Sequence, residues 1–219
     1  MHLTAATITT AEDVLRFWFA GRWSTATMDA HQRRWFGRDA AFDGAIRTRF
    51  GHDIRAAAAG DHDGWADSPR GRLALIIVMD QLTRNAFRAS AEAYALDPRA
   101  AGLSIEGVAR GLDSALTPIE RMFFYLPLLH SERLADQQRG VACFRRLSAE
   151  ASGPQARYFR TWLRLARRHR RIVAWFGRFP HRNAILGRTT TLRERIFLFY
   201  QRLRAMAAPL VRLLRSRND

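Results

Sequence analysis

The sequence contains no lysine, so arginine supplies all 36 of its basic residues and the formal net charge is +16. A biased genomic base composition also replaces lysine by arginine, so the charge alone does not identify a ligand. The distribution of the charge along the sequence is more informative. Residues 1–150 hold 19 arginines and 18 acidic residues, a net charge of +1, whereas residues 151–219 hold 17 arginines and two acidic residues, a net charge of +15. This asymmetry favours nucleic acid, anionic lipid or an acidic protein as a partner of the C-terminal third.

Cysteine and long apolar runs are also scarce. Cys143 is the only cysteine, which excludes an intramolecular disulfide, and its apolar helical setting predicts an inert, buried thiol. The longest apolar runs, 73–79 and 122–129, are far shorter than the roughly 20 residues of a membrane-spanning helix. The N-terminal residues lack a basic stretch followed by an apolar run, so no signal peptide is expected. We therefore predict a cytoplasmic protein.

The common catalytic and nucleotide-binding signatures are absent. The sequence has no GxxxxGK[ST] or GxGxxG phosphate-binding loop, no HExxH metal motif and no GxSxG nucleophile motif. The best candidates for metal ligands, His130, Glu132, His169 and His181, lack the spacing of three or four residues that brings two helical ligands to one metal. We therefore predict neither a metal nor a cofactor.

What the sequence does contain is ample apolar material and clear helix starts. Hydrophobic residues make up 47% of the chain and aromatic residues 11%, which is typical of a globular protein. Capping residues precede proline at Ser68, Asp97 and Thr117, and Thr10 precedes a short acidic turn. Two segments, 117–120 and 191–194, have the spacing of capping boxes. Each of these positions predicts the first turn of a helix.

Apolar residues recur at helical spacing and no segment alternates with the period of a strand. We therefore predict an all-α fold, an antiparallel, tetratricopeptide-like array of about eight helices. They are expected near residues 10–20, 27–36, 40–59, 69–88, 98–110, 118–149, 154–176 and 192–215. Pro127 should kink or split the sixth helix.

The domain organisation is expected to be simple. Residues 151–154 (ASGP) coincide with the step in charge and could mark a boundary, but the remaining 69 residues would bury little surface alone. We therefore predict a single domain over residues 1–219, with a basic C-terminal extension from about residue 201.

The first polar constellation follows an apolar run at 73–79. At helical spacing, Asp80, Arg84 and Arg88 share one face, and Gln81 and Asn85 line the adjacent strip. A helix that is apolar all round is buried, so this polar ridge should begin inside the protein. The alternative to a binding site is a structural ion pair between Asp80 and Arg84.

The second constellation is His130, Ser131 and Glu132, which lie just after Pro127. A proline inside a helix frees backbone groups, so these side chains could point into a cleft. A single histidine is more often structural than catalytic, and three consecutive side chains cannot all face one way. The sequence is compatible with both a structural histidine and a polar cluster that faces a cleft.

The third constellation is the stretch 176–188, FGRFPHRNAILGR. Gly177 should end a helix, and a short helical turn over 183–186 should be closed by Gly187. Arginines and a histidine would then surround a helix N-terminus, which favours a carboxylate or phosphate; these are Arg178, His181, Arg182 and Arg188. The alternative is a turn with solvated charges whose phenylalanines fill the core.

Together with these constellations, the stretches VLRFWF (14–19), RWF (34–36) and FDGAI (42–46) form a distinctive pattern. It resembles the bacterial family called domain of unknown function 924, whose fold is of the tetratricopeptide-like helical class. The resemblance implies that twelve residues belong to one site: Asp80, Gln81, Arg84, Asn85, His130, Ser131, Glu132, Arg178, His181, Arg182, Asn183 and Arg188. The chain departs from the family pattern at Thr83, where proline is usual, at Arg133, where an acidic residue is usual, and in a longer, more basic tail.

Three functions are consistent with these features. The leading hypothesis is a pocket that binds a small anionic molecule, with catalytic roles for His130, His181 and Glu132 and ligand binding by the other nine residues of the implied site. The alternative is a tetratricopeptide-like scaffold that binds another protein. The third is docking of the basic C-terminal region on nucleic acid or an anionic membrane, which a weakly amphipathic pattern over residues 208–217 supports.

Overall fold

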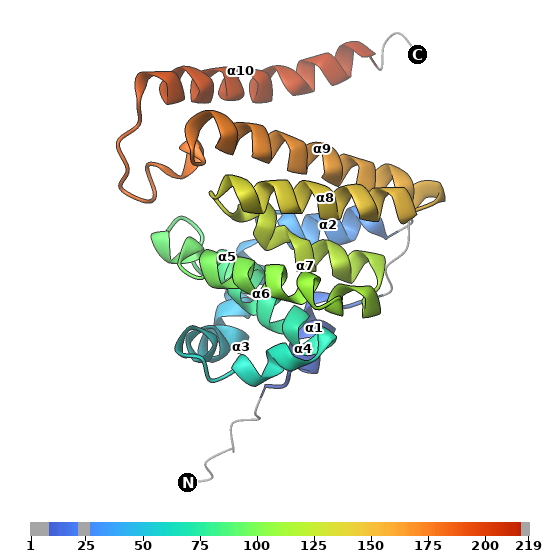
Figure 1. Ribbon diagram of the computed structural model, residues 1–219. Helices are drawn as coiled ribbons and strands as arrows, with labels where there is room; N and C mark the ends of the chain where they lie inside the picture. The colour runs from blue at the N-terminus through green and yellow to red at the C-terminus, as the bar shows by residue number, and fades with distance from the viewer. Residues whose placement is uncertain (1–8, 22–26, 216–219) are drawn as a thin grey trace.

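Helices fill the part of the chain that the computed structural model describes, residues 9–21 and 27–215, and no strand occurs there (Figure 1). The α-helices are α1 (Ala11–Trp18), α2 (Met28–Phe36), α3 (Ala40–Ala59), α4 (Pro69–Ile76), α5 (Thr83–Ala86), α6 (Asp97–Ala109), α7 (Pro118–His130), α8 (Leu134–Glu150), α9 (Gly153–Phe176) and α10 (Leu192–Arg215). The all-α prediction is confirmed. The predictions that concern the extreme N-terminus and residues 216–219 lie outside the described residues.

The shorter elements are single helical turns that join the α-helices. A π-helical segment, η2 (Ile77–Leu82), joins α4 to α5, so residues 69–86 form one helix with a wider turn in its middle. The remaining short elements have the tighter 3-10 geometry: η1 (Asp63–Asp67), η3 (Ala91–Tyr94), η4 (Leu112–Ala115) and η5 (Pro180–Arg182). A π-helical turn is rare and often marks a functional site, because it re-aims the side chains that follow it.

Most of the predicted helix starts are confirmed. At the start of α1, Thr10 and Asp13 form a reciprocal capping box, with N–H to side-chain oxygen distances of 3.0 and 3.2 Å. The capping boxes at 117–120 and 191–194 are also present, and Ser68 Oγ accepts a hydrogen bond from the N–H of Gly71. These bonds satisfy N–H groups that the first turn of a helix leaves unpaired.

Asp97 is the exception among the predicted caps. The cap position of α6 is occupied by Leu96, and Asp97 is already the first helical residue. Its carboxylate does not cap the helix, because both of its oxygens bind arginine side chains instead. The prediction of a cap at Asp97 was therefore wrong, and a buried charge pairing explains the aspartate better.

The long helix predicted over 118–149 does split, but not at Pro127. α7 continues through Pro127 to His130, and the backbone becomes extended at Ser131 and Arg133. The break is stabilised by Gln137, whose amide donates hydrogen bonds of 2.7 Å to the carbonyls of Leu129 and Ser131. Carbonyls at a helix C-terminus lack partners within the helix, and Gln137 supplies them from the next helix.

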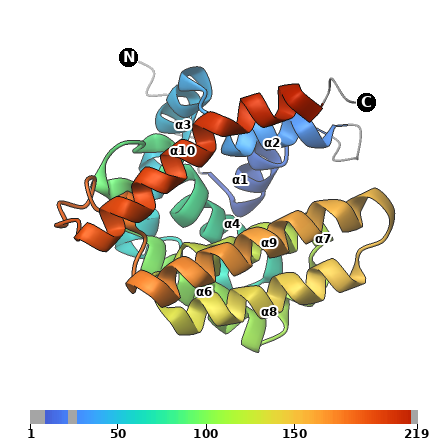
Figure 2. The ribbon, with the colours of Figure 1, turned by 90° about the horizontal axis from the view of Figure 1, so that it is seen from above.

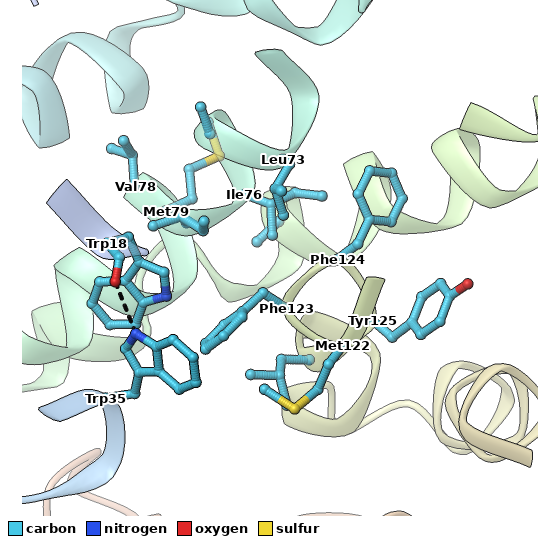
Figure 3. Close-up of a cluster of buried hydrophobic side chains, with 14 of the residues drawn as sticks. Trp18, Trp35, Leu73, Ile76, Val78, Met79, Met122, Phe123, Phe124 and Tyr125 are labelled. Carbon is cyan, nitrogen blue, oxygen red and sulfur yellow. Dashed lines mark hydrogen bonds between the residues drawn. The ribbon is translucent and has the colours of Figure 1, made fainter. Parts of the chain in front are cut away.

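Consecutive helices pack side by side in the second half of the chain. Figures 1 and 2 show α8 and α9 lying against each other along most of their length, with α7 packed on α8. The main core joins this layer to the N-terminal helices (Figure 3). There, Trp35 Nε1 donates to the carbonyl of Trp18 at 2.9 Å, and the ring of Phe123 lies edge-on to both indoles.

A second, smaller apolar cluster holds the end of the chain against α9. Phe179, Ile172 and Val173 are buried in it, and Phe176 stacks obliquely on Phe197 of α10 with 4.9 Å between ring centroids. α9 ends at Gly177, whose φ of 68° is the left-handed conformation that favours glycine. The sequence placed this helix end correctly.

His169 is half-buried, and the lone thiol is buried. His169 lies 5.2 Å from the ring of Phe179, and its Nδ1 lies 3.2 Å from the carbonyl oxygen of Leu129. Cys143 is buried, and burial raises the pKa of its thiol to about 11, as expected for an unreactive cysteine. No helix in the described ranges is both long enough and apolar enough to cross a bilayer.

Replacement of Gly107 by alanine tests the packing between α6 and α7. A methyl group at this position would overlap the ring of Phe124 and lie 2.8 Å from Cδ of Arg72, so Gly107→Ala should destabilise the fold by about 1–3 kcal/mol. The matched control is Gly102→Ala in the same helix, where a methyl group meets nothing within 4 Å. That change should stabilise the protein by about 0.5–1 kcal/mol. Urea denaturation of both variants measures the difference, and equal stabilities would contradict this packing.

His169 predicts a pH dependence of stability. Burial, helped by nearby His130, lowers the pKa of His169 to about 3, whereas an unfolded histidine titrates near about 6.5. Its contribution is therefore complete above about pH 6.5 and declines as the pH falls toward about 3, because only the unfolded chain takes up the proton.

In the His169→Gln variant the amide can still donate to the Leu129 carbonyl but does not titrate. Between about pH 6.5 and about pH 4.5, the wild type should lose up to about 2 kcal/mol more free energy of unfolding than this variant. Urea midpoints at the two pH values provide the measurement. Parallel losses in both proteins would show that the pKa of His169 is not lowered in the folded protein.

Candidate functional site

A cavity of about 320 Å³ opens where three segments meet. These are η3 with the start of α6, the connection between α7 and α8, and the loop that follows α9. The lining side chains are Ala91, Tyr94, Ala95, Asp97, Pro98, His130, Ser131, Glu132, Arg133, Arg182, Leu186 and Arg188. Five residues of the site that the family resemblance implies are among them.

His130 is held in the cavity wall by a carboxylate. Its Nδ1 lies 2.6 Å from Oδ1 of Asp80, which projects from the π-helical turn and is completely buried. Asp80 also accepts hydrogen bonds from Arg84 Nε at 3.2 Å and from Gln81 Nε2 at 2.5 Å. With Nδ1–H donating to Asp80, the other ring nitrogen, Nε2, carries the free lone pair.

The charges in this pair are set by their surroundings. Burial opposes ionisation of Asp80, but its contacts with His130 and Arg84 outweigh that cost and hold its pKa well below the ordinary range. Burial lowers the pKa of His130, and Arg84 adds to this effect, although Asp80 opposes it. The arrangement is therefore an ionised carboxylate beside a neutral imidazole.

Asp97, which lines the cavity, joins two arginines. Arg84 Nη2 binds both of its carboxylate oxygens at 2.7 Å, and Arg182 Nη1 binds one of them at 3.1 Å. All three side chains are largely buried. Since Arg84 also binds Asp80, its guanidinium connects the π-helical turn to the start of α6, and Asp97 extends this connection to the loop after α9 through Arg182.

Arg182 is fixed by aromatic rings as well as by charge. Its guanidinium carbon lies 4.6 Å from the ring centroid of Tyr94 and 4.7 Å from that of Phe179. Its Nε is buried without a hydrogen-bond partner among the described residues. A guanidinium stacked in this way loses little further freedom when it binds an anion.

Glu132 and Ser131 are occupied by structural contacts. The carboxylate of Glu132 binds Arg188 Nη1 through both oxygens, at 3.0 and 2.8 Å, and accepts a hydrogen bond of 2.8 Å from the N–H of Phe179. Ser131 Oγ donates to Asp136 at 2.7 Å. Glu132 thus ties the loop after α9 to the turn between α7 and α8.

Seven residues of the implied site do not line the cavity; besides the supporting Asp80 and Arg84, these are Gln81, Asn85, Arg178, His181 and Asn183. Arg178 binds Glu194 at 2.7 and 3.0 Å and anchors the start of α10, and His181 is exposed beside a separate hollow near α10. Asn85 and Asn183 are buried, and the only hydrogen bond from the Gln81 side chain in the described ranges goes to Asp80. The structure therefore divides the twelve residues between the cavity, its supports and the attachment of α10.

The predicted ring of charges around one helix N-terminus was wrong. The helical turn after Phe179 is η5, which begins at Pro180, and residues 183–187 form hydrogen-bonded turns closed by Gly187 at φ 63°. Arg178, Arg182 and Arg188 each turn to a different carboxylate. Long arginine side chains reach the nearest buried acid, and the sequence does not specify where that acid lies.

Sequence reasoning missed three side chains of the site, Tyr94, Asp97 and Arg133, the last of which had been noted only as a departure from the family pattern. Asp97 was interpreted as a helix cap, and Tyr94 had no local signal at all. Arg84 and Arg182 both occur beside apolar sequence, and buried arginines need acidic partners, which is the one signal that pointed to a missing carboxylate. No group of three or more acidic, histidine or cysteine side chains in the described ranges is arranged to hold a metal ion.

Comparison with known proteins gives a family. Residues 14–201 match the family model described as bacterial protein of unknown function (DUF924). The solved structure of the protein of unknown function ATU0120 from Agrobacterium tumefaciens is 40% identical in sequence, with a TM-score of 0.72 over 86% of this chain and 96% of that one. No curated protein matches the sequence. The chain therefore belongs to the DUF924 family of bacterial proteins.

Proposed function

We propose that the cavity binds a small molecule with an anionic group and that His130 exchanges a proton with it. The observation that carries this proposal is the 2.6 Å contact between Asp80 and His130 at the cavity wall. A buried carboxylate that binds one ring nitrogen fixes the orientation and the tautomer of the imidazole. The lone pair on Nε2 is then available to a ligand, as general base catalysis requires.

The charge of the cavity supports an anionic ligand. Three arginines and two acidic residues are among its lining side chains, so positive charge is in excess. The hydrogen bonds found among the described residues use Nη1 of Arg182 and of Arg188 but not their Nη2 groups. Guanidinium groups with free N–H donors suit carboxylates and phosphates. The volume of about 320 Å³ is at the lower end of the usual range and fits a small metabolite.

The remaining residues have supporting roles in this proposal. Asp80 orients His130, while Arg84 and Asp97 hold the floor of the cavity together. Glu132 keeps Arg188 and the loop after α9 in place. His181, which lies outside the cavity, has no part in the proposed proton transfer.

The alternative function is a protein-binding scaffold. A groove between α2 and α9 is lined by the exposed ring of Phe36 together with Trp162 and Leu165, and an apolar groove of this kind suits a helix of another protein. The two functions place the ligand differently: a small anion would bind in the cavity beside Arg188, whereas a helix of another protein would bind in the groove beside Trp162. A partner that binds the groove would protect Trp162 from solvent and leave Arg188 unaffected.

Binding of small anions tests the cavity. Inorganic phosphate and a panel of short mono- and dicarboxylates are added, and the shift in melting temperature is measured. At least one anion should stabilise the wild type, and Arg188→Gln should weaken its binding by roughly 10- to 100-fold, the effect of losing a charge-assisted hydrogen bond.

Arg178→Gln is the matched control, because Arg178 comes from the same loop and also pairs with a glutamate but lies outside the cavity. Its affinity for the anion should equal that of the wild type. Equal weakening in both variants, or no stabilising anion in the panel, would remove the support for this site.

The stability of two further variants distinguishes a residue that holds the cavity together, Arg84, from the residue proposed to exchange a proton, His130. Arg84→Ala leaves two buried carboxylates without their shared partner and should lower the free energy of unfolding by about 3–5 kcal/mol. His130→Asn places an amide donor where Nδ1 was, so Asp80 keeps a partner and the loss should stay below about 1 kcal/mol. Urea denaturation measures both.

The same His130→Asn protein lacks Nε2 and should lose the pH dependence of anion binding. A loss of stability as large as that of Arg84→Ala would instead make His130 a structural residue.

A further inference from the structure

The outward face of α10 is apolar. Five large side chains on it are exposed by between 43% and 76%: Leu192, Ile196, Phe199, Leu203 and Met206. They are spaced by four and three residues in turn, which places them in one stripe along the helix. An exposed apolar stripe of this length marks an interaction surface.

This stripe is not the face that attaches α10 to the rest of the protein. The inward face carries Phe197, which packs on Phe176, and Gln201, whose amide oxygen accepts a hydrogen bond from Arg168 at 2.7 Å. It also carries the buried Glu194, which binds Arg178. In Figure 1, α10 lies beyond α9 at the edge of the molecule. The five residues of the stripe are exposed to solvent.

Arginines border the stripe on both sides. At 100° per residue, Arg193 and Arg204 lie along one edge and Arg195 and Arg202 along the other, and all four are exposed. The surface carries no exposed acidic residue between Leu192 and Met206, because the one glutamate there, Glu194, is buried on the opposite face. The apolar stripe is therefore set in positive charge.

Two further aromatic residues extend the surface onto α9. Trp175 and Tyr200 are exposed by 62% and 60% and line the same hollow between α9 and α10, together with Arg171 and Arg204. Figure 2 shows α10 running at an angle to α9. Tryptophan and tyrosine favour the boundary between apolar chains and polar headgroups, since their rings combine both characters.

We propose that this α10 surface docks on the surface of an anionic membrane. The stripe would enter the boundary between headgroups and acyl chains, and the bordering arginines would contact anionic headgroups, the arrangement that favours interfacial helices. A second copy of the chain fits less well, because pairing two stripes would bring rows of arginine together. Nucleic acid would engage the arginines but would leave the apolar stripe in water.

Co-sedimentation of the full chain with vesicles tests the proposal. Binding should be strong to vesicles of equal parts phosphatidylglycerol and phosphatidylcholine, and weaker by about tenfold or more to phosphatidylcholine alone. The double change Ile196→Ser with Phe199→Ser should weaken binding to the anionic vesicles by about tenfold or more. Leu134→Ser, an exposed apolar residue on α8, is the control and should leave binding unchanged.

A second pair of variants tests whether the position of the arginines matters, and not only the net charge of the protein. Arg195→Gln with Arg202→Gln should weaken binding by about tenfold, whereas Arg38→Gln with Arg55→Gln removes the same net charge from exposed positions before and on α3 and should have little effect. Circular dichroism confirms that each variant keeps its helical content.

Three results would overturn the proposal. The first is equal binding to both kinds of vesicle or to neither. The second is an oligomer in light scattering that the double serine change converts to a monomer, because the stripe would then be an interface between copies. The third is binding to duplex DNA that the arginine variants lose but the serine variants keep, together with no preference for anionic vesicles.

Discussion

The buried pairing of Arg84 with Asp80 and Asp97 is the interaction on which the site depends. A guanidinium cannot be buried without acidic partners, and two carboxylates cannot be buried close together without a cation between them. The three side chains come from three elements, so satisfying their charges fixes the π-helical turn, the start of α6 and, through Arg182, the loop after α9. The cavity exists because these elements meet there and not because any one of them is concave.

The same logic explains why His130 is accessible. α7 passes through Pro127 and ends at His130, and Gln137 satisfies the carbonyls that the helix end leaves free. The next residues are held by their own partners, Ser131 by Asp136 and Glu132 by Arg188. The polar groups around the turn are therefore engaged with each other, and His130 lines the cavity while its Nδ1 is bound to Asp80. The number of polar residues in this part of the sequence would not have distinguished His130 from its neighbours.

The arginines of the loop after α9 have different roles. Arg182 and Arg188 turn toward the cavity, while Arg178 turns away and fixes α10 through Glu194. α10 is attached by its polar and partly buried face and keeps its apolar stripe outward. In the C-terminal third, Arg178, Arg182 and Arg188 are paired with nearby acids, whereas the exposed arginines of α9 and those that border the stripe on α10 contribute positive charge to the surface.

The sequence by itself determined the helices. Capping boxes at residues 10–13, 117–120 and 191–194 and the left-handed Gly177 are local interactions within a few residues, so their patterns predict them correctly. The family pattern identified His130, Arg182 and Arg188, which do line one cavity. Only the tertiary structure decided which partner each charge meets. Asp97 is 13 residues from Arg84 and 85 from Arg182. Contacts over such distances depend on how the helices pack, and a long arginine side chain binds whichever carboxylate that packing brings within reach.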